Sequence, residues 1–183
     1  MLMGVTNDDI DKVFLKNWRI DNEEEQLGKM HNKGFYLGLS PAFGLRNVLN
    51  VLRKVGFNVR VLSGLIDSPY VEEEKIEWCF NYGFSREDII LLPMSERKCD
   101  YVEAINENTI LVDDYKRYLD EWKSLGGKTI LVNRKYNGAV SETEVRNFYD
   151  ILEVLAYWSG LELTASERDE LREEWLYLLY GHE

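Results

Sequence analysis

Four short apolar runs that alternate with helical segments constrain the fold of this chain most strongly. The runs are "NVRVL" (58–62), "DIILL" (88–92), "TILV" (109–112) and "KTILV" (128–132). Apolar residues recur at helical spacing between them, over about 70–81 and about 115–125. Strands that are apolar throughout and alternate with helices are typical of a parallel sheet covered on both faces. The sequence therefore predicts an α/β fold with a parallel sheet flanked by helices.

The helical segments each have a predicted buried face. A further helix is expected before the first strand, with Gly56 after its last apolar residue. A short helix is expected after Pro93. Apolar residues recur at helical spacing at Leu45, Val48, Leu49, Leu52 and Val55, and the short helix contains Cys99, Val102 and Ile105. The residues predicted to point inward are Val71, Ile76, Phe80, Tyr118, Leu119, Trp122 and Leu125.

The C-terminal part differs from the rest in composition. Residues 142–158 and 165–180 read as two helices with no strand between them, and "SETE" at 141–144 fits a capping box. We expect an α/β domain over 1–140 and a two-helix extension over 141–183 packed on the same domain. The extension has eleven acidic and three basic residues, so it carries −8 of the net charge of −11. It is either a solvated helix face or a partner-binding face.

Composition excludes some classes of function. A net charge of −11 opposes passive binding to nucleic acid, which needs a basic surface. It is compatible with metal-bridged chemistry on a phosphate, and with competition against nucleic acid for a basic partner. No apolar run approaches the roughly 20 residues of a membrane span, and no signal peptide is visible. Cys79 and Cys99 are expected to be reduced and buried in a cytoplasmic protein.

Residues suited to phosphate chemistry follow the predicted strands. Ser63 follows the first strand, Lys98 ends the "PMSERK" segment after the second, and Asp113 and Asp114 follow the third. Ligands bind beyond the carboxyl ends of parallel strands, so these side chains are expected to converge. The hydroxyl can bind a phosphate oxygen, the ammonium can offset its charge, and the carboxylates can hold Mg²⁺.

Several of these segments together resemble a known family. They are "KGFYLGLSP", "VRVLSG", "SPYVEEEKIEW", "PMSERKCDYV" and "ILVDDYKRYLDEWKSLGGKTILVN". Over about residues 33–138 the chain resembles the haloacid-dehalogenase (HAD) superfamily, and within it the 5′(3′)-deoxyribonucleotidase-like proteins of phages and Gram-positive bacteria. The resemblance implies a Rossmann-like sheet and Mg²⁺-dependent hydrolysis of nucleotide phosphates. It assigns Ser63 to the second motif, Lys98 to the third, and Asp113 with Asp114 to the metal-binding fourth.

The first motif of that family supplies the nucleophile. It reads D-x-D-G-[TV] after an apolar strand, and the available match here is "DIDKV". The resemblance implies that Asp9 attacks phosphorus, that Asp11 acts as general acid–base, and that both help to hold Mg²⁺.

The same stretch also fits a helix start. Lys12 stands where the family has glycine, and the preceding "GVTND" is polar where a buried strand is expected. "TNDD" followed by apolar residues at helical spacing over 10–18 also matches a capped amphipathic helix. Both readings of Asp9 and Asp11 remain open.

Two classes of function follow from these features. The first is an enzyme, a Mg²⁺-dependent phosphoester hydrolase (nucleotidase or nuclease) acting on a nucleotide or on RNA or DNA; a housekeeping nucleotidase is its simplest form. The second is a binding protein on a HAD fold that no longer catalyses. With its acidic extension and phage-type resemblance, it is expected to act as an anti-CRISPR inhibitor of a Cas nuclease or of its guide RNA.

Overall fold

The computed structural model contains two compact units. One comprises residues 1–40 and 60–144, and the other comprises 41–59 and 145–183. The residues that the structure describes are 28–41, 45–132, 144–145, 151, 154–155, 158, 160 and 164–166. Helices and short parallel strands within them confirm the mixed α/β class. Within these residues, no helix is long and apolar enough to cross a membrane.

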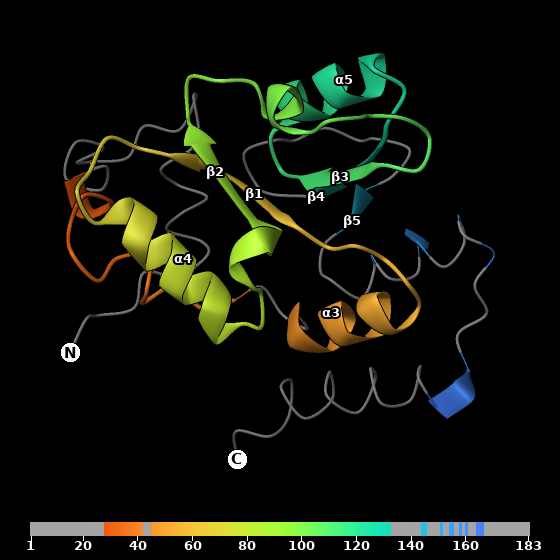
Figure 1. Ribbon diagram of the computed structural model, residues 1–183, viewed down its shortest axis with the longest axis horizontal. Coiled ribbons are helices and arrows are strands. Elements are labelled where there is room, and N and C mark those ends of the chain that lie inside the picture. Colours follow the sequence, from red (N-terminus) through yellow and green to blue (C-terminus); the bar gives the residue numbers. More distant parts are fainter. Residues whose placement is uncertain are drawn as a thin grey trace. The chain divides into compact units, whose positions relative to one another are not determined.

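The strands of the first unit form two small sheets (Figure 1). β1 (Val61–Leu65) pairs in parallel with β2 (Ile89–Pro93). β3 (Ile110–Asp113) pairs in parallel with β4 (Lys128–Val132), and β5 (Glu144–Val145) lies next to β4. The predicted parallel pairing is therefore confirmed. The described strands nevertheless do not form the single continuous sheet that the sequence suggested.

The helices of this unit begin and end near the predicted positions. α4 (Val71–Asn81) precedes Gly83, which has a φ of 88°. α5 (Lys116–Ser124) precedes Gly126, which has a φ of 92°. Glycine tolerates this left-handed backbone, so both helices stop there. Two 3₁₀ turns, η1 (Arg86–Asp88) and η2 (Lys98–Tyr101), flank β2.

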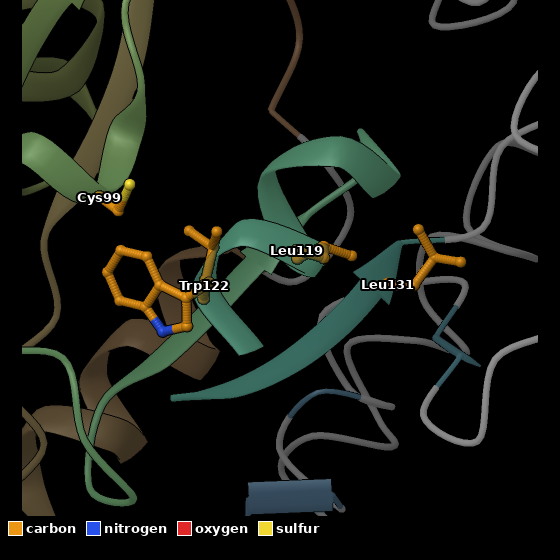
Figure 2. Close-up of a cluster of buried hydrophobic side chains, with 5 residues drawn as sticks. Cys99, Leu119, Trp122 and Leu131 are labelled. Atoms are coloured by element: carbon orange, nitrogen blue, oxygen red, sulfur yellow. The ribbon is translucent and has the colours of Figure 1, made fainter. Parts of the chain in front are cut away.

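A core cluster of five buried side chains holds β3, β4 and α5 together with η2. It consists of Cys99, Leu111, Leu119, Trp122 and Leu131, four of which are labelled in Figure 2. The partly buried Leu62 of β1 packs against the same cluster. Lys98, next to Cys99, and Asp113, two residues after Leu111, are therefore each close in sequence to an anchored core residue.

A second cluster packs the turn before the first sheet against α4. Met30, Tyr36 and Val71 are buried in it. Leu39 accepts a hydrogen bond from Trp78 Nε1 through its backbone carbonyl, at 2.8 Å. These contacts fix the 30–39 segment to α4.

The second unit contains α3 (Leu45–Lys54). Its buried residues are Leu45, Val48, Leu49 and Leu52, as the helical spacing predicted. Gly56, with a φ of 94°, ends the helical run, and the Phe57 N–H donates to the Leu52 carbonyl at 2.9 Å. Ile151 and Leu155 of the same unit are also buried.

The sequence misplaced part of the buried face of two helices. Phe80 and Leu125, both predicted to point inward, are each 48% exposed. The buried residues of α4 are Val71, Glu74 and Cys79, so the inward stripe includes a carboxylate and excludes Phe80. Leu125 lies just beyond the last residue of α5, where the helical spacing no longer applies.

Three predicted element boundaries are also wrong. The strand expected at 58–62 is β1, whose pairing with β2 runs through Leu65. The short helix expected after Pro93 is the single 3₁₀ turn η2, which leaves Val102 and Ile105 outside it. Glu144–Val145 is a strand, so the helix and capping box expected from 141–142 do not begin there. Pairing along a sheet edge supplies backbone hydrogen bonds that local capping signals do not reveal.

Candidate functional site

The structure places four of the six predicted site residues in the first unit. Ser63 lies within β1, paired with Leu91 of β2, rather than beyond the strand end. Lys98 is the first residue of η2, Asp113 is the last residue of β3, and Asp114 follows it. Asp9 and Asp11 lie outside the described residues.

Lys98 of η2 and Asp113 at the end of β3 form an ion pair. Lys98 Nζ donates to Asp113 Oδ2, and the side chains are only 13% and 7% exposed. The other oxygen, Oδ1, accepts the Tyr115 N–H at 2.8 Å. The ammonium of Lys98 also lies 4.9 Å from the centroid of the Tyr118 ring. Each oxygen of Asp113 therefore has one donor from the chain itself.

Burial raises the pKa of Asp113 above its ordinary value. The neighbouring Lys98 ammonium opposes this effect, and the Asp114 carboxylate adds to it. The ionised form of Asp113 therefore depends on a cation beside it, which Lys98 supplies. Without Lys98, both burial and the Asp114 carboxylate would favour the protonated form of Asp113.

Ser63 is contacted by a lysine that sequence reasoning did not select. Lys75 of α4 donates from Nζ to Ser63 Oγ at 3.1 Å and to the Gly64 carbonyl. Its ammonium lies 4.8 Å from the centroid of the Tyr36 ring. In the sequence, Lys75 follows three glutamates and reads as part of a solvated face. The available signal is its spacing, because 71, 75 and 79 fall on one helix stripe, and Val71 and Cys79 are buried.

Lys75 occupies an environment that disfavours its charge. Its pKa is lowered to about 8, chiefly by burial and then by the positive charge of Lys98, while Cys79 acts in the opposite direction. The influence of Lys98 shows that the two ammonium groups lie within electrostatic reach of each other. Two interacting cations, one of them hydrogen-bonded to a serine hydroxyl, are an arrangement that favours a bound anion.

Met94 packs against β1 at Gly64. Its N–H donates to the Leu65 carbonyl at 3.1 Å, and its own carbonyl accepts the Tyr118 hydroxyl at 3.5 Å. A Cβ at Gly64 would lie 2.9 Å from Met94 Cγ. A glycine at this position therefore permits the methionine to pack directly on β1.

Asp113 and Asp114 fit part of a Mg²⁺ site. Mg²⁺ prefers oxygen ligands and is commonly held by one or two carboxylates together with substrate phosphate and water. Each oxygen of Asp113 retains a lone pair beside its one donor. Among the described residues, no group of three or more metal-binding side chains is present. The fit is thus to two carboxylates that share the ion with a phosphate.

Comparison with known proteins does not assign this chain to a family. No family model matches this chain, and no curated protein matches it. The HAD resemblance therefore stays a proposal that rests on the sequence motifs.

Proposed function

We propose that this protein is a HAD-like, Mg²⁺-dependent phosphoester hydrolase that acts on a nucleotide or nucleic-acid phosphate. One set of contacts carries the proposal: Lys75 of α4 donates to Ser63 within β1, Lys98 pairs with Asp113 at the end of β3, and the two ammonium groups interact electrostatically. These groups are the donors and charges that a phosphate group and its bound cation require.

Ser63 and Lys75 would bind the phosphate together. An ammonium group only donates hydrogen bonds, so Ser63 Oγ accepts from Lys75. The hydroxyl proton of Ser63 is then left to point elsewhere, toward a phosphate oxygen. Lys75 has three protons, two of which are used by Ser63 and Gly64, and its charge stabilises the same anion.

Lys98 and the acidic pair would act on the opposite side of the phosphate. Lys98 has three donors, so it can retain Asp113 while it contacts a phosphate oxygen. Asp113 and Asp114 would hold Mg²⁺, which when bound neutralises charge on the phosphate oxygens. Asp9 as nucleophile and Asp11 as general acid–base complete the proposed set.

The hydrolase is tested by phosphate release from nucleoside monophosphates and by cleavage of short RNA and DNA strands, with Mg²⁺ and with EDTA. We expect Mg²⁺-dependent turnover of one of these substrates that is lost in Asp9→Asn and reduced at least 100-fold in Lys75→Met, since general and electrostatic groups of this kind contribute about 10²–10⁴-fold. Lys123→Met, at an exposed position of α5, serves as the matched control. Absence of turnover in the folded protein, or full activity of Asp9→Asn, would contradict the proposal.

A specific observation also supports a second candidate, a non-enzymatic inhibitor on the same fold. Lys98 and the Tyr115 N–H already bind both oxygens of Asp113, an arrangement that is stable without a metal. The acidic 141–183 segment would then bind a basic, nucleic-acid-binding protein such as a Cas effector.

Pull-down on a Cas effector, with and without guide RNA, tests the inhibitor. Amide substitutions at Glu167, Asp169, Glu170, Glu173 and Glu174 remove five of the charges of this segment without shortening the chain. We expect them to abolish binding, whereas Asp9→Asn leaves it intact. Binding that survives the amide substitutions would contradict the role given to the segment.

A further inference from the structure

The buried carboxylate of Glu74 has no role in the site as described so far. Glu74 is 5% exposed and lies one residue before Lys75 on α4. Its Oε1 accepts the Gly34 N–H, and its Oε2 accepts the Tyr36 N–H at 3.1 Å. Both oxygens thus bind the backbone of a turn that is about 40 residues away in the sequence.

These two hydrogen bonds to Glu74 determine where the Tyr36 ring lies. Gly34, whose N–H donates to Glu74, has a φ of 87°. Glycine readily adopts this left-handed backbone conformation. Tyr36 is buried with Met30 and Val71, and its ring packs edge to face with the Phe35 ring at a centroid distance of 5.0 Å. Backbone and side chain of Tyr36 are therefore both held against α4.

The Tyr36 ring in turn contacts the site lysine. Lys75 Nζ lies 4.8 Å from the ring centroid and also donates to Ser63 Oγ. The ring face attracts the ammonium electrostatically and keeps water from it. The groups that face this ammonium are Tyr36 from the turn, Ser63 and the Gly64 carbonyl from β1, Cys79 from α4 and Lys98 from η2.

We propose that Glu74 and Tyr36 are positioning residues for the anion site. Glu74 fixes the Gly34–Tyr36 turn to α4, the turn holds the Tyr36 ring under Lys75, and the ring keeps the ammonium on Ser63. The inference rests on the proposed function for its anion. Its structural core, the control of Lys75 by Tyr36 and Glu74, is measurable without any ligand.

The chain offers matched variants for this test. Tyr36→Leu removes the ring, whereas Tyr36→Phe keeps the ring face that Lys75 contacts. Glu74→Gln replaces one of the two acceptor oxygens with a donor, and Glu73→Gln makes the same change at an exposed neighbour on α4. Two quantities are measured for each variant, namely the pKa of Lys75 by NMR of its side-chain nitrogen and the Kd for inorganic phosphate by calorimetry.

We expect Tyr36→Leu and Glu74→Gln to raise the pKa of Lys75 from about 8 toward its ordinary 10.5, because burial is the largest cause of the lowered pKa and its relief outweighs the lost attraction of the ring. Both should weaken phosphate binding roughly three- to tenfold, as loss of a cation–π contact implies. Tyr36→Phe and Glu73→Gln should match the wild type. If Tyr36→Leu does not fold, Glu74→Gln and its control decide the question by themselves.

The results separate the two proposals. If Lys75→Met loses phosphate but Tyr36→Leu and Glu74→Gln keep the wild-type Kd and Lys75 pKa, the positioning role is wrong and the anion site stands. If Lys75→Met binds phosphate like the wild type, the anion site is wrong. The pKa of Lys75 then tests the positioning role without phosphate. An unchanged Lys75 pKa in Tyr36→Leu and Glu74→Gln would overturn this role, and a raised Lys75 pKa would support it.

Discussion

The charge of Lys75 should cost the folded protein stability in a pH-dependent manner. Its pKa is lowered from 10.5 to about 8, chiefly by burial and then by Lys98. Each pKa unit corresponds to about 1.4 kcal/mol, so the charged lysine destabilises the fold by about 3 kcal/mol at pH 7. Because the folded-state pKa is the lower one, the unfolded chain binds more protons between pH 8 and 10.5, and this part of the stability rises with pH.

The stability cost of the Lys75 charge should fall between pH 7 and pH 9.5, a range in which unfolding can be measured. At pH 9.5 the folded lysine is mostly neutral, while the unfolded one is mostly charged, and the remaining cost is about 1 kcal/mol. The wild type should therefore gain about 2 kcal/mol relative to Lys75→Met between pH 7 and 9.5. The lost hydrogen bonds to Ser63 and Gly64 affect the variant at both pH values and largely cancel in this comparison.

Urea denaturation of both proteins, followed by tryptophan fluorescence at pH 7 and 9.5, measures this double difference. Lys123→Met removes an exposed lysine of α5 and should show no such pH-dependent difference. A difference between wild type and Lys75→Met that stays constant over the two pH values would refute the environment assigned to Lys75. It would also remove the electrostatic basis of the proposed anion site.

Three further predictions concern packing and linkage. Gly127→Ala should destabilise the fold by about 1–3 kcal/mol in urea denaturation. Its Cβ would lie 2.3 Å from Trp122, whereas a Cβ at Gly28 meets nothing within 4 Å, so Gly28→Ala is the control. Gly64→Ala should displace Met94 and weaken phosphate binding. The double variant Gly64→Ala with Met94→Ala should restore the phosphate affinity. If it does not, the clash with Met94 is not the cause of the weaker binding. Finally, phosphate affinity should fall roughly 20-fold between pH 7.5 and 9.5 as Lys75 loses its proton, and Lys75→Met should lack this pH dependence in calorimetric titrations.

The sequence predicted the local elements of the fold better than the burial of individual side chains. The bounds of β4 match the apolar run 128–132, and α4 lies within one residue of its predicted start. Glycines at their boundaries, Gly83 after α4 and Gly127 before β4, are local signals. Phe80 was misplaced because Glu74 and Lys75 occupy the inward side of α4, and an apolar pattern cannot reveal buried charges.

The sequence predicted where Lys98 and Asp113 lie relative to the strands, but it misplaced Ser63. The α/β alternation puts Asp113 at the end of β3 and Lys98 after β2, whereas Ser63 lies within β1 rather than beyond it. The partner of Ser63 is on a helix, at a position that three preceding glutamates make look solvated. Only the turn at Gly34–Tyr36, which binds Glu74 and covers Lys75, shows that this stretch faces inward.

The balance of charge around Lys75 is an argument for function in its own right. The described residues that affect its pKa through their charge are Lys98 and Cys79, and neither is a carboxylate. Nearby Glu74 is buried, but both of its oxygens bind backbone N–H groups of the turn. A buried ammonium without an ionised carboxylate is costly, and a fold under selection for stability alone would favour a methionine here. A phosphate between Lys75 and Lys98 would supply the missing negative charge, so the cost in the free protein becomes binding energy when the anion is present.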